Sequence, residues 1–286
     1  MGIQITNSDK MTVWLNGEFS RLSNAGISPL DRGIQRGDGL FETIRVQKGN
    51  VLFLDDHLKR LIGSARILRI NIPSYDWKSI IDELIEQNEL SGSISRLKIL
   101  ITRGVVDEPG LPEANLPTII LICDKYSPPT QNQYEAGWKL HTFKTGYSPP
   151  LAMHKSLHYQ FYMFARQHAL DNNADDAIIL DPEGYVSETT STSIIYRKNG
   201  KYFTPQSQFQ LPGITVQKIM EFLRQTNHDV MYKPTTIDGL ISADSIFITS
   251  SLMGVMPINT VDEIPISVVD STFAKILRNF LFNCSD

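Results

Sequence analysis

A polar break at residues 124–133 constrains the fold of this chain more than any other single feature. Its sequence, DKYSPPTQNQ, contains two prolines and lacks helical or strand periodicity, which is typical of a connection between domains. Strand-like segments cluster on both sides of the break, and the helices are grouped instead of alternating one for one with strands. The sequence therefore predicts an α+β protein of two domains, residues 1–124 and 134–286, joined by a linker at residues 125–133.

The first half combines antiparallel strands with two helices. Residues 12–19 surround an Asn-Gly turn and predict a β-hairpin, while residues 39–46 alternate like a half-buried strand. After Leu54 the apolar period becomes helical up to about residue 68, with Asp55 or Asp56 as the expected N-cap. The other elements expected here are a helix at residues 77–90 and strands at residues 51–54, 95–102 and 117–123.

The second half has the same mixed character. The apolar run at residues 176–181 predicts a buried strand, and Asn199-Gly200 predicts a hairpin turn. Further strands are expected at residues 138–143, 185–187, 193–197, 201–204 and 246–249, and helices at residues 157–170, 215–226 and 271–282.

Charge and composition exclude several classes of protein. A net charge of −4 and a pI near 5.9 argue against nucleic acid or an anionic membrane as the partner. No apolar run approaches the roughly 20 residues that a membrane span needs. The cysteines, Cys123 and Cys284, lack metal-like spacing, so we expect reduced thiols, a cytoplasmic location and no metal site.

Lys155 and Glu188 are the residues that most directly indicate chemistry. Lys155 stands just ahead of a helical pattern, and Glu188 ends a strand-like run further along the chain. Pyridoxal phosphate needs both groups, because a lysine amine holds its aldehyde as a Schiff base and a carboxylate keeps its ring nitrogen protonated. Most lysines and glutamates are solvated surface groups, so the assignment depends on the segments around them.

Three segments could bind the phosphate of such a cofactor. Gly213 opens a predicted helix, so the Ile214 and Thr215 amides and the Thr215 hydroxyl lie at its positive end. Each segment alone is more often a helix cap or a surface feature. The other two candidates are the hydroxyl cluster with Ser250 and Ser251, and the Arg60 guanidinium, which could supply a fixed cation.

Seven motifs in one order resemble the class IV aminotransferase family, the fold-type IV pyridoxal phosphate enzymes. In chain order they are WLNGEF, DRGIQRGDGLFETIRV, HLKRL, MHKSLHY, ADDAIILDPEGYVSET, LPGIT and TSSLMGVMPI. The resemblance covers nearly the whole chain. It implies a two-domain fold like that of D-amino acid aminotransferases, with the cofactor lysine in the larger C-terminal domain, and it implies a homodimer.

The resemblance also implies a role for each matching residue. Lys155 would hold the cofactor and move a proton, and Glu188 would pair with the ring nitrogen. Phosphate would be bound by Arg60, Gly213, Ile214, Thr215, Ser250 and Ser251. Three positions depart from the family pattern, namely His158, Ser193 and Val216, which puts fine positioning in doubt but not cofactor binding.

The segments GDGLFETIRV, RLKILITRG and LMGVMP are similar to those of 4-amino-4-deoxychorismate lyases, which form 4-aminobenzoate and pyruvate for folate biosynthesis. The loop after Arg103 lacks the Arg-x-His pair of D-amino acid aminotransferases, and FETIR differs from the FEGIR of branched-chain enzymes. The lyase is therefore favoured, with an amino acid aminotransferase as the alternative. We expect Arg96 and Arg103 to bind substrate carboxylates and Phe41 to form an apolar wall.

Overall fold

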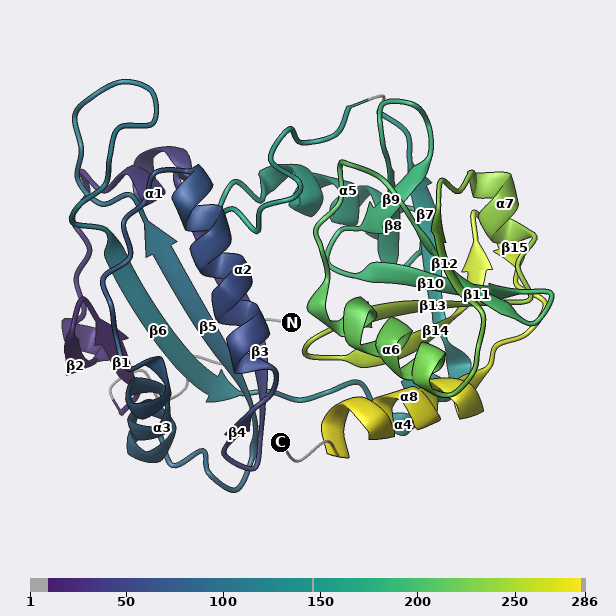
Figure 1. Ribbon diagram of the computed structural model, residues 1–286, viewed down its shortest axis with the longest axis horizontal. Coiled ribbons are helices and arrows are strands. Elements are labelled where there is room, and N and C mark those ends of the chain that lie inside the picture. The colour runs from purple at the N-terminus through teal and green to yellow at the C-terminus, as the bar shows by residue number, and fades with distance from the viewer. Residues whose placement is uncertain (1–9, 146, 284–286) are drawn as a thin grey trace. The chain divides into compact units, whose positions relative to one another are not determined.

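The computed structural model describes residues 10–145 and 147–283 (Figure 1). The chain forms two compact units. Unit 1 consists of Met1–Ser127 and His154–His158, and unit 2 of Pro128–Met153 and Tyr159–Asp286. Cys284 lies outside the described residues. None of the helices in the described part of the chain is both long and apolar enough to cross a bilayer.

Unit 1 is a six-stranded antiparallel sheet in the order β2-β1-β6-β5-β3-β4. Its strands are β1 (Thr12–Leu15), β2 (Glu18–Arg21), β3 (Gly39–Gln47), β4 (Asn50–Val51), β5 (Ile94–Thr102) and β6 (Thr118–Lys125). Its helices are η1 (Leu22–Asn24), α1 (Arg32–Arg36), α2 (Leu54–Ile67) and α3 (Trp77–Gln87). Figure 1 shows α2 lying across the sheet.

Strand alternation gives the sheet of unit 1 two different faces. On β5, Leu97 and Ile99 are fully buried in a core that also contains Leu61 of α2 and Leu84 of α3. The side chains between them point to the opposite side because successive strand residues face opposite ways, and they are only half-buried. We call this second side the open face. It carries Phe41 and Thr43 of β3, Arg96, Lys98 and Leu100 of β5, and Ile120 and Ile122 of β6.

The segment that contains Lys155 pairs with the free edge of β3. The Phe41 amide donates to the Lys155 carbonyl at 2.8 Å, and the Leu157 amide donates to the Gly39 carbonyl at 2.9 Å. These bonds place Lys155 in unit 1, whereas the sequence predicted it in the C-terminal domain. The boundary between the units differs accordingly from the predicted one, because residues 154–158 return to the first sheet.

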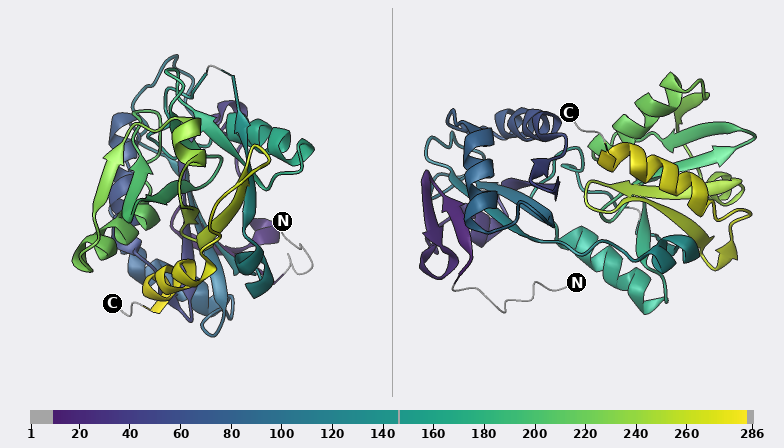
Figure 2. Two further views of the ribbon diagram at one scale, coloured as in Figure 1. Left: turned by 90° about the vertical axis from the view of Figure 1, so that its right-hand side faces the viewer. Right: turned by 90° about the horizontal axis from the view of Figure 1, so that it is seen from below.

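Unit 2 is built on a nine-stranded mixed sheet in the order β12-β11-β10-β13-β14-β7-β8-β9, with β15 paired to β14. Its strands are β7 (Trp138–Phe143), β8 (Asp176–Leu180), β9 (Val186–Thr189), β10 (Ser193–Lys198), β11 (Lys201–Pro205), β12 (Val230–Lys233), β13 (Ser245–Ser250), β14 (Gly254–Val261) and β15 (Ile264–Pro265). Its helices are α4 (Gln131–Ala136), α5 (Gln160–Asp171), α6 (Ile214–Gln225), α7 (Ile237–Ile241) and α8 (Ser271–Asn283). Figure 2 shows the ribbon of unit 2 from two further sides. Helices α6 and α8 meet through the stacked rings of Phe222 and Phe280, whose centroids are 4.3 Å apart.

The predicted α+β fold is confirmed, and the predicted strands and helices are present within a few residues, except that the strand expected at residues 51–54 is reduced to Asn50–Val51. Two local predictions were wrong. Helix α2 is preceded by Phe53 in the left-handed conformation, with no side-chain cap, so Asp55 and Asp56 lie in its first turn instead of capping it. Helix α4 begins inside the predicted linker because Thr130 and Gln133 form a capping box.

Gly39 is required by the close approach of strands β3 and β5. A Cβ atom at this position would lie 2.4 Å from the Ile101 carbonyl oxygen and 2.8 Å from Leu157, whereas one at Gly63 in α2 would meet nothing within 4 Å. We expect Gly39→Ala to lower the free energy of unfolding by about 1–3 kcal/mol. The matched control Gly63→Ala should raise it by roughly 0.5–1 kcal/mol through helix propensity. Urea unfolding measures both, and a shift of the same sign in the two variants would contradict the assignment.

Candidate active site

Lys155 is positioned by backbone pairing and lies over an aromatic ring. Its Nζ is 4.5 Å from the centroid of Phe41, on the open face of the sheet. The two backbone hydrogen bonds to β3 fix the position of the Lys155 backbone. The Phe41 ring borders the Lys155 amine. The structure thus brings together two residues that the sequence proposed for the site.

A buried carboxylate organises the other side of β3. Glu42, next to Phe41 in the strand, points toward α2 and accepts hydrogen bonds from two residues of that helix. Its Oε2 lies 2.7 Å from Nδ1 of His57, and Arg60 donates through Nε and Nη2 at 2.7 Å each. His57 and Arg60 are three positions apart and so share one face of α2. The side chains of Glu42 and His57 are each 1% exposed.

Electrostatics fixes the charge states in this cluster. Burial opposes ionisation of Glu42, but hydrogen bonds from His57 and Arg60, together with the positive charge of Arg60, outweigh it and lower the pKa of Glu42 to about 2. Burial lowers the pKa of His57, and the charges of Arg60 and Lys155 act in the same direction. Together they outweigh the hydrogen bond and the negative charge of Glu42, which raise that pKa. Glu42 is therefore an anion beside a neutral imidazole that donates from Nδ1. The Glu42 carboxylate also orients the Arg60 guanidinium through two hydrogen bonds.

Glu188 occupies a buried position on β9 of unit 2. Its side chain accepts hydrogen bonds from the Tyr162 hydroxyl to Oε1 and from the Leu211 amide to Oε2, each at 3.1 Å. The residue is 7% exposed. Burial and the negative charge of Glu188 raise the pKa values of Tyr159 and Tyr162, so both remain hydroxyl donors.

The glycine turn and the hydroxyl cluster lie together in unit 2. Gly213 precedes helix α6, and a Cβ atom there would come within 2.3 Å of the Ser193 hydroxyl. Ser193 is paired in turn with Thr249 across strands β10 and β13, directly before Ser250 and Ser251. The buried Thr249 hydroxyl has no hydrogen-bond partner among the described residues. Ile214 and Thr215 form the buried first turn of α6. Polar groups and a side-chain-free backbone thus converge here, as binding of an anion requires.

The two arginines expected to bind substrate carboxylates are occupied by protein groups. Arg96 pairs with Asp124 on the neighbouring strand, through Nε at 3.0 Å and Nη2 at 2.6 Å. Arg103 is 0% exposed. Its guanidinium donates to both oxygens of Asp38 and to the carbonyls of Leu68, Arg69 and Pro112. These five bonds use all five donors of the guanidinium, so Arg103 stabilises the loop and has no donor left for a substrate.

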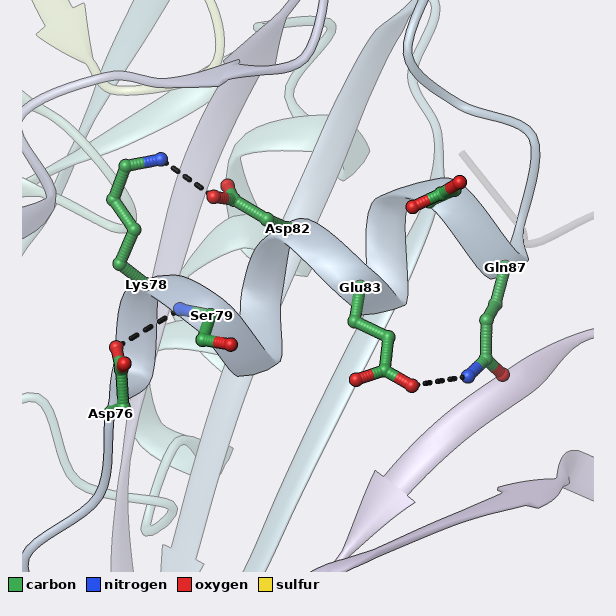
Figure 3. A pocket seen from close by; sticks show the side chains of 7 residues that line it. Asp76, Lys78, Ser79, Asp82, Glu83 and Gln87 are labelled. Atoms are coloured by element: carbon green, nitrogen blue, oxygen red, sulfur yellow. Dashed lines mark hydrogen bonds and ion pairs between the residues drawn. The ribbon is translucent and has the colours of Figure 1, made fainter.

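Two further features of the described residues are a depression along α3 and the histidine pair His154 and His158. A wide, open depression of about 760 Å³ runs along the solvent side of α3, and Figure 3 shows that it is lined by charged side chains of that helix. His154 and His158 have the four-residue spacing of some metal motifs, but His154 contacts Ser64 at 3.0 Å and His158 lies beside Gly37. The described part of the chain contains no group of three or more potential metal ligands.

Sequence reasoning missed Glu42, His57 and Tyr162. Glu42 carried a signal, because an acidic residue on the buried side of an alternating strand needs a partner, and HLKRL offers one. Tyr162 carried none, since a tyrosine near the start of a helix is unremarkable without its three-dimensional neighbours.

Comparison with known proteins shows the family of the chain. A family model described as "Amino-transferase class IV" matches residues 39–261, and the chain belongs to that family. The "Putative branched-chain-amino-acid aminotransferase" of Methanocaldococcus jannaschii is 33% identical, over 88% of this chain and 88% of the relative. The "Aminodeoxychorismate lyase" of Vibrio harveyi is 27% identical, over 94% of this chain and 98% of the relative.

The fold is also that of a solved aminotransferase structure. The branched-chain amino acid aminotransferase of Escherichia coli superimposes with a TM-score of 0.83, at 22% identity, over 96% of this chain and 94% of the other. The predicted fold-type IV architecture is confirmed by this likeness.

The Glu42 cluster predicts a specific dependence of stability on pH. Because the folded-state pKa of Glu42 is about 2, below its ordinary value of 4.5, its contribution is complete above pH 4.5 and lost as the pH falls toward 2. This contribution amounts to about 3 kcal/mol, and Glu42→Gln should remove a similar amount at pH 7.

The measurement is the free energy of urea unfolding between pH 7 and pH 3. This free energy should fall less on acidification in Glu42→Gln than in the unchanged protein. Asp82→Asn is the matched control, since it breaks the exposed Lys78–Asp82 pair and should cost less than about 1 kcal/mol. Equal effects of the two variants would show that Glu42 is not a buried anion.

Proposed function

We propose that this protein is a pyridoxal phosphate enzyme in which Lys155 holds the cofactor. The observation that carries the proposal is the fixed position of Lys155, whose backbone pairs with β3 while its amine lies over Phe41. Membership in the class IV aminotransferase family supports it. In this proposal Glu188 pairs with the ring nitrogen.

The residues proposed for the phosphate fit that group. Glu42 holds the Arg60 guanidinium in one orientation, which suits a planar cation that receives phosphate oxygens. The unpartnered Thr249 hydroxyl is what an anion site would leave, and the absence of a side chain at Gly213 lets the Ser193 hydroxyl approach the start of α6. The proposed phosphate ligands are Arg60, Gly213, Ile214, Thr215, Ser250 and Ser251.

The chemistry divides between the cofactor and the chain. When bound, pyridoxal phosphate supplies an electron-accepting ring for a bond broken at the substrate's amine-bearing carbon. Lys155 moves the proton at that carbon, acting as a general base and acid. Phe41 covers one side of the lysine amine and limits access of water. Glu188 holds a proton at the ring nitrogen, which maintains the electron demand of the ring.

We propose 4-amino-4-deoxychorismate lyase as the activity, because the open face suits a substrate with carboxylates. Lys98 pairs in register with Thr43, next to the row that holds Phe41 and Leu100. Burial and the charge of Arg96 lower the pKa of Lys98. A half-buried cation this close to the apolar row favours a carboxylate-bearing ring over a branched aliphatic side chain. Lys98 thus replaces Arg103 as the proposed carboxylate partner.

An aminotransferase is the second candidate. The Methanocaldococcus jannaschii relative, named as a branched-chain aminotransferase, is more similar in sequence than the Vibrio harveyi lyase. In that activity the same lysine would move a proton between two carbon atoms, and a 2-oxo acid would accept the amino group. L-Glutamate, which carries a second carboxylate, is the donor most compatible with Lys98.

The two activities separate in one spectroscopic experiment on the purified protein. Pyridoxal phosphate is added and its visible absorbance is followed with D-alanine, L-glutamate or L-leucine, and then with 4-amino-4-deoxychorismate. We expect the band to persist with all three amino acids, and 4-aminobenzoate and pyruvate to form in equal amounts from the last compound. Rapid bleaching by one amino acid would instead identify an aminotransferase. A protein that takes up no cofactor would overturn the proposal as a whole.

The role of Lys98 has its own test. Lys98→Met keeps the length of the side chain and removes its charge, so KM for a substrate with two carboxylates should rise roughly tenfold or more, through loss of a charge-assisted hydrogen bond. Lys59→Met, at an exposed position of α2, is the matched control and should leave KM unchanged. An unchanged KM in Lys98→Met would remove Lys98 from the substrate site.

A further inference from the structure

One face of helix α5 is directed at the paired strands β8 and β9, which carry Asp176 and Glu188. Tyr159, just before the helix, donates its hydroxyl to the Thr190 carbonyl, and Tyr162 donates to Glu188. One turn further, Arg166 forms an ion pair with Asp176 at 3.0 Å. The spacing of three and four residues places these three side chains on the same side of the helix.

Tyr162 is held firmly at this position. Its ring lies 5.0 Å from that of Tyr159 and 5.4 Å from that of Phe161. The hydroxyl of Tyr162 and the amide of Leu211 approach different oxygens of Glu188, so the carboxylate receives one donor on each side. A carboxylate that accepts such bonds is stabilised as an anion relative to its protonated form.

Strand β8, which pairs with the Glu188 strand β9, is held by contacts of Asp176. Asp176 is 0% exposed and accepts hydrogen bonds from the Ala177 amide at 2.8 Å and the Thr189 hydroxyl at 3.0 Å, in addition to its pair with Arg166. Thr189 directly follows Glu188 in β9. Helix α5 is therefore tied to strands β8 and β9 one turn away from Tyr162. This tie limits how far the Tyr162–Glu188 hydrogen bond can lengthen.

We propose that Tyr162 is a positioning residue that keeps Glu188 anionic and thereby keeps the proton on the cofactor ring nitrogen. This inference rests on the proposed function, and it adds a residue to which neither the sequence motifs nor the family match assign a role. Tyr162 acts through Glu188 and needs no contact with the cofactor.

In the proposed enzyme, Glu188 and the cofactor ring nitrogen share one proton. The proton between Glu188 and the ring nitrogen can reside on either atom, and each hydrogen bond to the carboxylate favours its residence on nitrogen. Loss of a hydrogen bond to a charged group shifts such an equilibrium by roughly tenfold or more toward the neutral pair. An unprotonated ring accepts electrons less readily, so the step at the amine-bearing carbon slows by a similar factor.

The test compares Tyr162→Phe with Tyr196→Phe, both loaded with pyridoxal phosphate labelled with ¹⁵N in the ring. Tyr196 is a buried tyrosine of the same unit whose hydroxyl contacts Thr235, not Glu188. We expect the ¹⁵N resonance to move toward the chemical shift of an unprotonated pyridine nitrogen in Tyr162→Phe, with kcat lowered roughly tenfold. In Tyr196→Phe the ¹⁵N resonance and kcat should both remain as in the unchanged protein.

A second variant keeps the inference testable if Tyr162→Phe does not fold. Replacement of Tyr162 by 3-fluorotyrosine preserves the ring and strengthens the hydroxyl donor, so the ¹⁵N resonance should move in the opposite direction. Lower thermal stability with an unchanged ¹⁵N resonance would overturn the inference, because Tyr162 would then only pack. Failure of the unchanged protein to take up cofactor would refute the proposed function instead, which separates the two outcomes.

Discussion

The pairing of residues 155–157 with the free edge of β3 is the interaction on which the rest of the candidate site depends. Two backbone hydrogen bonds hold Lys155 beside Phe41, and the absence of a side chain at Gly39 lets β3 approach both β5 and this segment. These bonds fix the backbone from which the Lys155 side chain extends, so the backbone part of the conformational entropy is lost before any ligand binds. The lysine is thereby preorganised, which lowers the cost of reaching a reactive geometry.

Strand β3 serves two purposes because its residues alternate between faces. Phe41 points to the open face and borders the lysine amine, whereas its neighbour Glu42 points into the core and orients Arg60. One strand thus connects the apolar wall with the anchor of a proposed phosphate ligand. The cost is a buried charge, which is tolerated because Arg60 and His57 supply three short hydrogen bonds.

Unit 2 uses the same principle for a second carboxylate. Glu188 is enclosed by a helix tyrosine and a loop amide, and the Asp176–Arg166 pair ties that helix to the same strand region. Both acidic residues are surrounded by fixed donors, so their charges and directions are set by the protein. In the proposed enzyme this rigidity determines where protons reside, while the cofactor supplies the electron-accepting ring.

The sequence by itself determined the α+β class, most of the elements and the family, because these depend on local periodicity, turn residues and ordered motifs. It also indicated Lys155, Phe41, Arg60 and Glu188 as candidates. Only the tertiary structure decided that residues 154–158 belong with the first sheet and that Arg103 has its donors occupied. It also decided that Glu42 accepts from Arg60 and that Tyr162 donates to Glu188. The physical reason is that strand-edge pairing, the partners of a guanidinium and the donors around a buried carboxylate are contacts between distant segments. A linear pattern shows the periodicity of each segment but not the neighbours that it acquires on folding.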